Sequence, residues 1–342
     1  MNYSIHTIEL RREYRTHIEF NKFLSHLYAM SRGRFSIFQL EDNVWHAEIF
    51  KGKGIRVVLK KTLIGGYLKF IVSLNDLLGA DDKLSLIDPQ HIQEALNSAD
   101  TMLTGEFGEE FSINNLELSR VDYCINVNVE SSENVRAYIK QLYRCDTRKG
   151  YKVIGLECPD FDTTKGYTAR NDIAGTEISF YDKQKQLEQR QYEDSERASG
   201  ILRIELRLTK SKAVKEHTEG CINNHERIVY CIGNSRREIL AVVRQLIPDG
   251  DYYTMKKARA MVRKSVKNQK LRERMLEMLK LTKKLGSIRL AKKELRNKDP
   301  KIKHEYFNMM MEEFEMLNLN VVTMDKDNKV IKLPSLFYYL EK

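Results

Sequence analysis

The sequence predicts an α+β fold, in which an antiparallel sheet carries helices on one face and a helical, winged-helix-like segment follows. Stretches that alternate apolar and polar residues, as strands do, fill most of the chain before Ala213. Helical periodicity takes over from Ala213 onward. The turn-forming stretch Pro248-Asp249-Gly250-Asp251 then marks a boundary where the charge of the chain changes.

These observations divide the chain into three segments. Residues 1–110 form an N-terminal α/β region with a β meander, and residues 111–250 form the core of the sheet. We expect these two segments to share one domain. We expect residues 251–342 to form a basic, winged-helix-like domain, and the charge described below predicts that it binds DNA.

The composition is that of a soluble globular protein, with 42% hydrophobic and 31% charged residues among 342. No run of about eighteen apolar residues occurs, and the N-terminus is polar, so neither a membrane span nor a secretory signal is expected. The five cysteines include no CxxC pair, which favours free thiols in a reducing cytoplasm.

The positive charge is concentrated near the C-terminus. Residues 251–342 hold 23 Lys and Arg against 12 Asp and Glu, a net +11, whereas the first 250 residues hold 35 against 36, a net −1. Between Lys256 and Lys303 the balance is 19 basic against 4 acidic residues. A polyanionic partner, most commonly nucleic acid, is implied; the alternative is a solvated, lysine-rich helical face.

The N-terminal elements follow from local signals. A strand over Ile5 to Leu10 and a helix over His17 to Met30 come first. Asp88 and Pro89 later begin a helix to Leu103, as N-cap and first helical residue. Four short strands punctuated by glycine are expected to form the antiparallel meander between these helices: Phe35 to Leu40, Val44 to Phe50, Ile55 to Leu59 and Gly66 to Val72.

Three strands of the predicted core carry polar side chains on one face. In Leu116 to Val129, Arg120, Asp122 and Asn126 alternate with an apolar face. Gly175 to Lys183 contains Tyr181 near its end, and Ile201 to Leu208 alternates leucine and isoleucine with Arg203, Glu205 and Arg207. The remaining elements before the boundary are a helix from Ser131 to Tyr143, a strand from Tyr151 to Leu156, a loop from Cys158 to Ala174, a helix from Lys183 to about Arg197 and a helix from Glu226 to Ile247.

The C-terminal segment reads as helices followed by a hairpin, the element order of a winged helix. The helices are Met255 to Lys267, Leu271 to Leu285, Ile288 to Leu295 and Ile302 to Leu317, and the hairpin joins Val321 to Met324 with Lys329 to Leu333.

The sequence lacks the common enzymatic motifs. The eight histidines form no HxH, HxxxH or HExxH zinc pattern, and no GxxxxGK[ST], GxGxxG or GxSxG occurs. If the strands pair, Asp122 and Glu205 can share one hard cation, Mg²⁺ or Mn²⁺. Tyr181 could then attack a phosphodiester, with the cation, Lys183, Arg203 or Arg207 lowering the barrier. The alternative is structural: a satisfied Asp122, a cross-strand ion pair at Glu205 and a packed Tyr181.

Three motifs resemble, in order, those of rolling-circle replication initiators, the trans-acting nickases of Gram-positive plasmids and mobile elements, with related phage proteins and conjugative-element relaxases. They are Ser119-Arg120-Val121-Asp122-Tyr123-Cys124-Ile125-Asn126, Ile178-Ser179-Phe180-Tyr181-Asp182-Lys183 and Leu202-Arg203-Ile204-Glu205-Leu206-Arg207-Leu208. The resemblance covers roughly residues 110–215. It implies a DNA nicking and closing endonuclease in the cytoplasm of a bacterial host, with a tyrosine nucleophile, a divalent ion held by acidic residues and a host helicase as partner.

Position by position, the resemblance implies Asp122 and Glu205 as metal ligands, Tyr181 as nucleophile and Lys183 as a phosphate-contacting cation. The chain departs from the family at Asn126, where a second acidic residue is common, so a ligand could shift to Asp182. Tyr192 on the following helix is an alternative nucleophile.

The resemblance does not reach the tail, where the charge predicts contacts to the origin duplex; on the sheet, Arg120 is expected to contact DNA. The tail residues expected to contact phosphates are Lys256, Lys257, Arg259, Arg263, Lys264, Lys292, Lys293 and Arg296. Other expected partners are the nicked single strand and a second copy of the chain. A relaxase for conjugative mobilisation, or a non-catalytic winged-helix DNA-binding regulator, is the alternative function.

Overall fold

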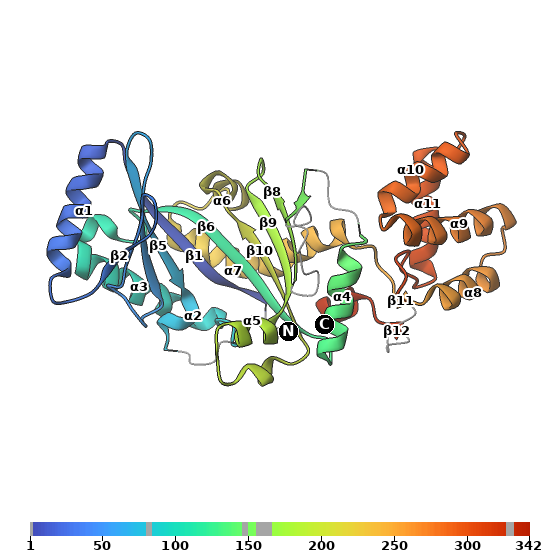
Figure 1. Cartoon of the computed structure of the whole chain (residues 1–342), viewed down its shortest axis with the longest axis horizontal. Coiled ribbons are helices and arrows are strands. Elements are labelled where there is room, and N and C mark those ends of the chain that lie inside the picture. The colour runs from blue at the N-terminus through green and yellow to red at the C-terminus, as the bar shows by residue number, and fades with distance from the viewer. Residues whose placement is uncertain (1–2, 80–83, 146–149, 155–165, 326–331) are drawn as a thin grey trace.

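The computed structural model describes residues 3–79, 84–145, 150–154, 166–325 and 332–342. The described residues form an α+β fold around one ten-stranded sheet, and every strand pair in it is antiparallel (Figure 1). The strand order is β2-β3-β4-β5-β1-β6-β10-β9-β8-β7. The sheet therefore runs without a break from the N-terminal segment into the predicted core.

The predicted meander is confirmed at one end of this sheet. Its strands are β2 (Ile37–Glu41), β3 (Val44–Ala47), β4 (Ile55–Lys61) and β5 (Gly66–Ser73), each paired with the next. The first strand of the chain, β1 (Tyr3–Tyr14), then joins β5 to β6 in the middle of the sheet.

The core strands lie on the other side of β1. They are β6 (Glu117–Asn128), β10 (Ile201–Leu208), β9 (Thr176–Asp182), β8 (Gly166–Asn171) and the short β7 (Lys152–Val153). The loop predicted from Cys158 to Ala174 is wrong at β8, while residues 158–165 lie outside the described residues. Tyr167 and Ala169 are buried and pair with Phe180 and Ile178, a contact with β9 that the polar residues between them conceal in the sequence.

Helices pack on the apolar face of the core strands. The longest, α7 (Asn224–Leu246), contacts β1, β6 and β10, and Tyr123 on β6 donates a 3.2 Å hydrogen bond to Sγ of Cys231 in α7 (Figure 1). Two shorter helices, α4 (Ser132–Leu142) and α6 (Ser211–His217), pack beside it. The opposite face of these strands is left to polar side chains.

The other helices lie around the meander and the strand ends. The helix predicted to run to about Arg197 ends at Gln189, because Gln191 adopts a positive φ of 59° that a helix cannot continue through. The helices are α1 (His17–Ser31), α2 (Leu74–Leu77), α3 (Ile92–Phe107) and α5 (Lys183–Gln189), with 3₁₀ turns at Pro89–His91, Glu109–Phe111 and Ser195–Ala198. No helix in the described ranges is long and apolar enough to cross a membrane.

The C-terminal helices form a separate group at the far end of the molecule (Figure 1). Their order is the predicted one: α8 (Met255–Ser265), α9 (Gln269–Leu285), α10 (Ile288–Lys298) and α11 (His304–Met316). Residues 326–331 of the predicted hairpin lie outside the described residues, and β12 (Lys332–Leu333) pairs with β11 (Tyr252–Tyr253). Met324 and Leu319 form isolated bridges to Thr254 and Asp251.

The end of the chain returns to the sheet. The helix α12 (Leu336–Leu340) is largely buried, and its Leu340 carbonyl accepts a 2.5 Å hydrogen bond from the Tyr3 hydroxyl. The carbonyl of Pro334 accepts a 2.7 Å bond from Tyr138 in α4. These contacts fasten the C-terminus to the core, so a deletion of the whole tail would expose core residues.

Candidate active site

A polar cleft lies over the face of the sheet that the helices leave open. Its volume is about 580 Å³. One wall is formed by residues of the core strands and α5, among them Asp122, Tyr181 and Glu205, and the opposite wall by residues of the meander, among them His46 and Arg56. Strand alternation places the polar residues of β6, β9 and β10 in this cleft, as the sequence predicts.

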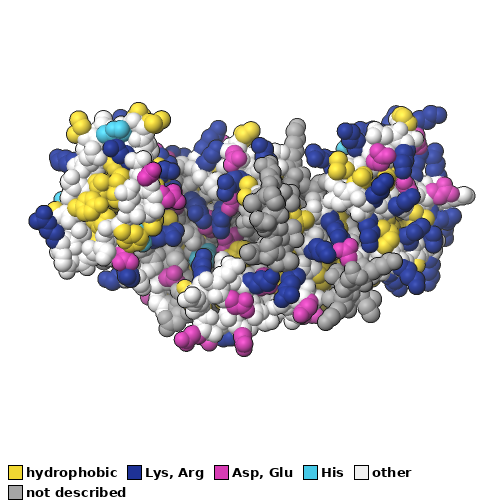
Figure 2. All heavy atoms as spheres, viewed as in Figure 1, with side chains coloured by type: hydrophobic (Ala, Val, Ile, Leu, Met, Phe, Trp, Pro, Cys, Tyr) yellow, Lys and Arg dark blue, Asp and Glu magenta, His cyan; other side chains and the backbone are white. Residues whose placement is uncertain are grey.

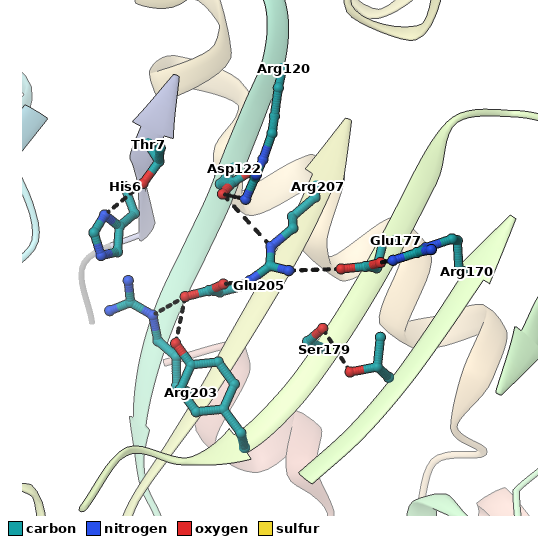
Figure 3. Close-up of polar contacts among 12 residues, drawn as sticks. His6, Thr7, Arg120, Asp122, Arg170, Glu177, Ser179, Arg203, Glu205 and Arg207 are labelled. Carbon is teal, nitrogen blue, oxygen red and sulfur yellow. Dashed lines mark hydrogen bonds and ion pairs between the residues drawn. The ribbon is translucent and has the colours of Figure 1, made fainter. Parts of the chain in front are cut away.

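Arg207 joins three carboxylates in the cleft (Figure 3). Its Nη1 donates a 2.7 Å hydrogen bond to Oε1 of Glu177, and its Nη2 donates a 2.7 Å bond to Oε2 of Glu205. Its Nε lies 3.7 Å from Oδ2 of Asp122. Antiparallel pairing explains this convergence, because Arg207 is the register partner of Asp122 on β6 and of Glu177 on β9.

A second and third arginine close the network. Arg120 binds Asp122 with both Nε at 2.6 Å and Nη2 at 2.5 Å. Arg203 is 1% exposed, lies 3.4 Å from Glu205, and donates a 2.9 Å bond to Oδ1 of Asn126. Asn126, where an acid was expected, therefore orients Arg203.

The Tyr181 hydroxyl points into the same network. It donates a 2.5 Å hydrogen bond to Oε1 of Glu205, the oxygen that also faces Arg203. Burial, together with the negative charge of Glu205, raises the pKa of Tyr181 well above its ordinary value. The phenol is therefore protonated at neutral pH. Its proton is hydrogen-bonded to the Glu205 carboxylate, which could accept it.

The two predicted metal-binding carboxylates differ in ionisation. Burial disfavours the charged form of Glu205, but Arg203, Arg207 and the Tyr181 hydroxyl outweigh it and hold its pKa at about 2. Burial dominates at Asp122 and raises its pKa in spite of Arg120. Glu205 is thus the firmly ionised carboxylate of the pair.

Three guanidinium nitrogens of the site form no hydrogen bond in the part of the chain that the structure describes, although the two Nε atoms among them lie within ion-pair distance of carboxylates. These are Nε and Nη2 of Arg203 and Nε of Arg207, all buried. Four arginines, counting Arg170 on Glu177, face three carboxylates, which leaves one positive charge in excess. Buried donors with excess positive charge suit an anion with several acceptor oxygens, such as a phosphodiester.

The donor atoms suit a hard cation in type, because Asp122, Glu177 and Glu205 all present carboxylate oxygens. Their arrangement does not form a metal cage. Within the described ranges, no group of three or more His, Cys, Asp or Glu is arranged to hold a metal ion. The Arg207 guanidinium occupies the position between the carboxylates, so a cation could bind only in competition with it.

Three predicted site residues lie outside this network. Asp182 faces the opposite side of β9, where it caps α5 by accepting a 3.3 Å bond from the Lys185 amide, so it is wrong as a substitute ligand beside Glu205. Tyr192 is 40% exposed and lines a smaller pocket of about 70 Å³ next to the cleft. Lys183 lines that pocket too, and its Nζ donates a 2.8 Å bond to Gln186.

Lys183 is buried, and burial together with the nearby Arg203 lowers its pKa to about 8. An amine with this pKa is protonated in most molecules at neutral pH and loses its charge in mildly alkaline solution. It can therefore act as a titratable cation at the edge of the site.

Sequence reasoning missed four residues of the site. Glu177 shares a face with Tyr181 at a spacing of four residues, so strand alternation could have identified it. Arg170 was hidden in the segment predicted as a loop, although it donates a 2.6 Å bond to Glu177. Gln186 and Arg190 line the cleft from α5 and its end, and no local pattern marks them.

The predicted DNA-binding residues of the tail are mostly exposed. Figure 2 shows Lys and Arg side chains gathered over the end of the molecule that α8 to α11 form. Five basic residues of α8 are exposed and have no carboxylate partner among the described residues: Lys256, Lys257, Arg259, Arg263 and Lys264. On α10, Lys293 is exposed, Lys292 is half-buried, and Arg296 lies over the ring of Phe307.

Comparison with known proteins adds no relatives. No family model matches the chain, and a search of curated proteins finds no match. The function is therefore argued from the geometry of the site.

Proposed function

We propose that the protein is a DNA nicking and closing enzyme that initiates rolling-circle replication by tyrosine transesterification. The observation that carries the proposal is the Tyr181 hydroxyl, hydrogen-bonded to Glu205 beside the buried guanidinium donors of Arg203 and Arg207. A nucleophile beside an anion-binding cluster is what attack on a phosphodiester requires. The order of the three motifs, which resembles that of rolling-circle initiators, supports the same reaction.

The chemical step exchanges one phosphodiester for another. The Tyr181 oxygen attacks phosphorus and forms a phosphotyrosyl bond, while the bond from phosphorus to the DNA 3′-oxygen breaks. The phenolic proton passes to Oε1 of Glu205, 2.5 Å from the phenolic oxygen, and the leaving 3′-oxygen takes a proton from solvent water to become a hydroxyl. The covalent bond conserves the energy needed for rejoining, so the same site can close the nick.

Arg203 and Arg207 can bind either Glu205 or the phosphate of the substrate. When a phosphodiester binds, Arg203 and Arg207 turn part of their hydrogen bonding from Glu205 to the phosphate oxygens. Glu205 then loses the charges that hold its pKa at about 2 and becomes a stronger base for the Tyr181 proton. Substrate binding itself thereby activates the nucleophile.

The proposal includes Mg²⁺ or Mn²⁺. Asp122 and Glu205 are the residues that would hold the ion, which would polarise the phosphodiester. Since Arg207 binds both Glu205 and Glu177, the ion must compete with this guanidinium.

The C-terminal segment is proposed to act as a winged-helix-like domain on the origin duplex. The exposed basic side chains of α8 supply phosphate contacts, with further contacts from α10. The helix α11 carries Glu305, Glu312, Glu313 and Glu315, so we do not expect it to supply the phosphate contacts. A host helicase and a second copy of the chain complete the proposed partners, in the cytoplasm of a bacterial host.

The proposal is tested with supercoiled DNA that carries the region of the protein's own gene, incubated with the protein and Mg²⁺ or Mn²⁺. We expect nicked circles with covalently attached protein. Binding without any nick would reject the enzyme and favour the non-catalytic regulator. A relaxase for conjugative transfer would give the same nick, and is distinguished by mobilisation of the nicked plasmid between cells.

A further inference from the structure

The turn between β4 and β5 exposes two large aliphatic side chains. Leu63 is 97% exposed and Ile64 is 78% exposed. The turn is held rigidly, because the Thr62 amide donates a 2.9 Å bond to the Gly65 carbonyl and the Thr62 carbonyl lies 2.9 Å from Nε2 of His17. A fixed turn with two apolar residues at its tip is built to contact something.

Two lysines lie directly before this tip, and the neighbouring turn carries Glu41 and Asp42. Lys60 and Lys61 end β4 directly before the turn, and Lys60 is exposed. The turn between β8 and β9 differs, since its exposed Ile173 follows Asp172 in sequence, and Lys210, which lies beside this turn, donates a hydrogen bond to the Asp172 carbonyl. Apolar residues flanked by lysines favour a nucleic acid, whose phosphates lie beside its stacked bases.

A basic row leads from this tip to the cleft along the open face of the sheet. Lys60 is paired with Tyr67, and Arg11 with Lys69, in adjacent strands. The Tyr67 ring lies between two cations, 4.6 Å from the Arg11 guanidinium carbon and 5.1 Å from Lys69 Nζ. Arg56, which lies two residues from Val58 on the same face of β4, lines the cleft itself. Two of these cations are paired with carboxylates on the same face, Lys69 with Glu9 at 2.9 Å and Arg11 with Glu13. Basic side chains around an aromatic ring are the usual surface for single-stranded DNA.

The proposed reaction needs unpaired DNA. Tyr181 lines a cleft that is walled on both sides, and a base-paired strand would carry its partner into that cleft. The sequence contains no nucleotide-hydrolysing motif, so any opening that this chain performs before the host helicase acts would draw on binding. Inserting an apolar side chain between base pairs is one way in which binding opens a duplex.

We propose that the hairpin tip, Leu63 and Ile64, is a wedge that separates the strands of duplex DNA, and that the row of Arg11, Lys60, Tyr67 and Lys69 leads the released strand to the cleft. This inference rests on the proposed function for its DNA partner. The tip lies beside α1, at the end of the molecule away from α8 to α11 (Figure 1). One end of the chain thus holds the duplex while the other opens it.

The test uses a forked DNA duplex with 2-aminopurine at the base pair next to the fork, whose fluorescence rises when that base unstacks. The full chain carries Tyr181→Phe, so that no cleavage disturbs the signal. We expect the fluorescence to rise severalfold on binding, and the rise to fall about tenfold in the double variant Leu63→Ser, Ile64→Ser. The matched control, Ile173→Ser on the other exposed hairpin, should behave as the parent.

The fold is not at risk in these variants, because all three side chains are exposed. A rise that is unchanged in the double variant, or absent in the parent while the fork is bound, overturns the wedge. A chain that binds no DNA overturns both the wedge and the proposed function. If the fork opens but the unmodified chain nicks no DNA, the wedge is supported and the proposed nicking activity is rejected.

A second measurement separates opening from chemistry. With Tyr181 restored, the double variant should cleave a single-stranded oligonucleotide within about twofold of the parent rate, while nicking of duplex DNA falls at least tenfold. Equal losses on both substrates would contradict a wedge. If the double variant instead loses binding to vesicles of anionic phospholipid and opens DNA normally, the tip is a membrane contact and the inference is wrong.

Discussion

The Tyr181 hydroxyl donates a 2.5 Å hydrogen bond to Oε1 of Glu205, across the paired strands β9 and β10. Glu205 is in turn bound by Arg207 at 2.7 Å and faces Arg203 at 3.4 Å. A proton donor, its acceptor and two cations thus lie within one buried cluster. This relationship can be probed through stability, pH dependence and chemistry separately.

Glu205→Gln should lower the free energy of unfolding by about 3 kcal/mol at pH 7, because it leaves the buried Arg203 without its charged partner and removes one of the three carboxylates around Arg207. The pKa of Glu205 is about 2 in the folded protein and 4.5 ordinarily. Its stabilisation is therefore present above pH 4.5 and lost as the pH falls toward 2. Urea denaturation at pH 7 and at pH 3 measures both effects.

The control for this variant is Glu188→Gln, an exposed carboxylate on α5. It should change the unfolding free energy by less than about 0.5 kcal/mol. If the difference in unfolding free energy between Glu205→Gln and the parent stayed constant down to pH 3, the arginines would not hold the carboxylate in its ionised form.

Lys183 should contribute a cation only below its pKa of about 8. We expect the nicking rate to fall as the pH rises through 8, and Lys183→Met to be slow with no such fall. Lys183→Arg, which stays charged, should keep its activity at pH 9 if the side chain fits. Rates measured from pH 6.5 to 9.5 decide this, and a parallel profile for Lys183→Met would assign the titration to another group.

The basic side chains of α8 should set the salt dependence of duplex binding. Replacing Lys256, Lys257, Arg259, Arg263 and Lys264 by Gln removes up to five phosphate contacts, so the slope of log K against log salt should become shallower by up to about 4.5. Titrations at several salt concentrations give this slope. Lys212→Gln on α6 serves as control, and an unchanged slope in the five-residue variant would remove α8 from the interface.

Divalent cations should be required for chemistry and not for DNA binding. Adding EDTA should abolish covalent attachment while duplex affinity stays within about twofold, and Mn²⁺ or Mg²⁺ should restore attachment. Asp122→Asn should raise the Mg²⁺ concentration needed at least tenfold, since it removes one proposed ligand. Attachment that persists in EDTA would mean that Arg203 and Arg207 stabilise the transition state without a metal ion.

Strand alternation was enough to predict which side chains share the polar face. It placed Asp122 on β6 with Arg203, Glu205 and Arg207 on β10, and the register of the two strands brings them together. The two-residue period of a strand depends only on local backbone geometry, so the sequence alone shows which residues share a face. Charge and turn signals likewise predicted α8 to α11 in their order.

What the sequence could not supply was pairing between distant segments. β8 was read as a loop because Tyr167 and Ala169 become an apolar face only when β9 lies beside them. The pairing of β12 is a second example, since its described residues find their partner in β11, far back in the chain. The arginines were predicted to share this face, but their hydrogen bonds to Asp122 and Glu205 depend on register, so the sequence could not show that Arg207 occupies the position between the carboxylates.

The most direct test of the account asks which residue becomes attached to DNA. The protein is allowed to nick supercoiled DNA, the covalent adduct is digested with nuclease and protease, and the modified peptide is identified by mass spectrometry. We expect a nucleotide on Tyr181, with attachment lost in Tyr181→Phe and kept in Tyr192→Phe. An adduct on Tyr192, or attachment that survives in Tyr181→Phe, would contradict the assignment of the Tyr181 and Glu205 pair as the reacting centre.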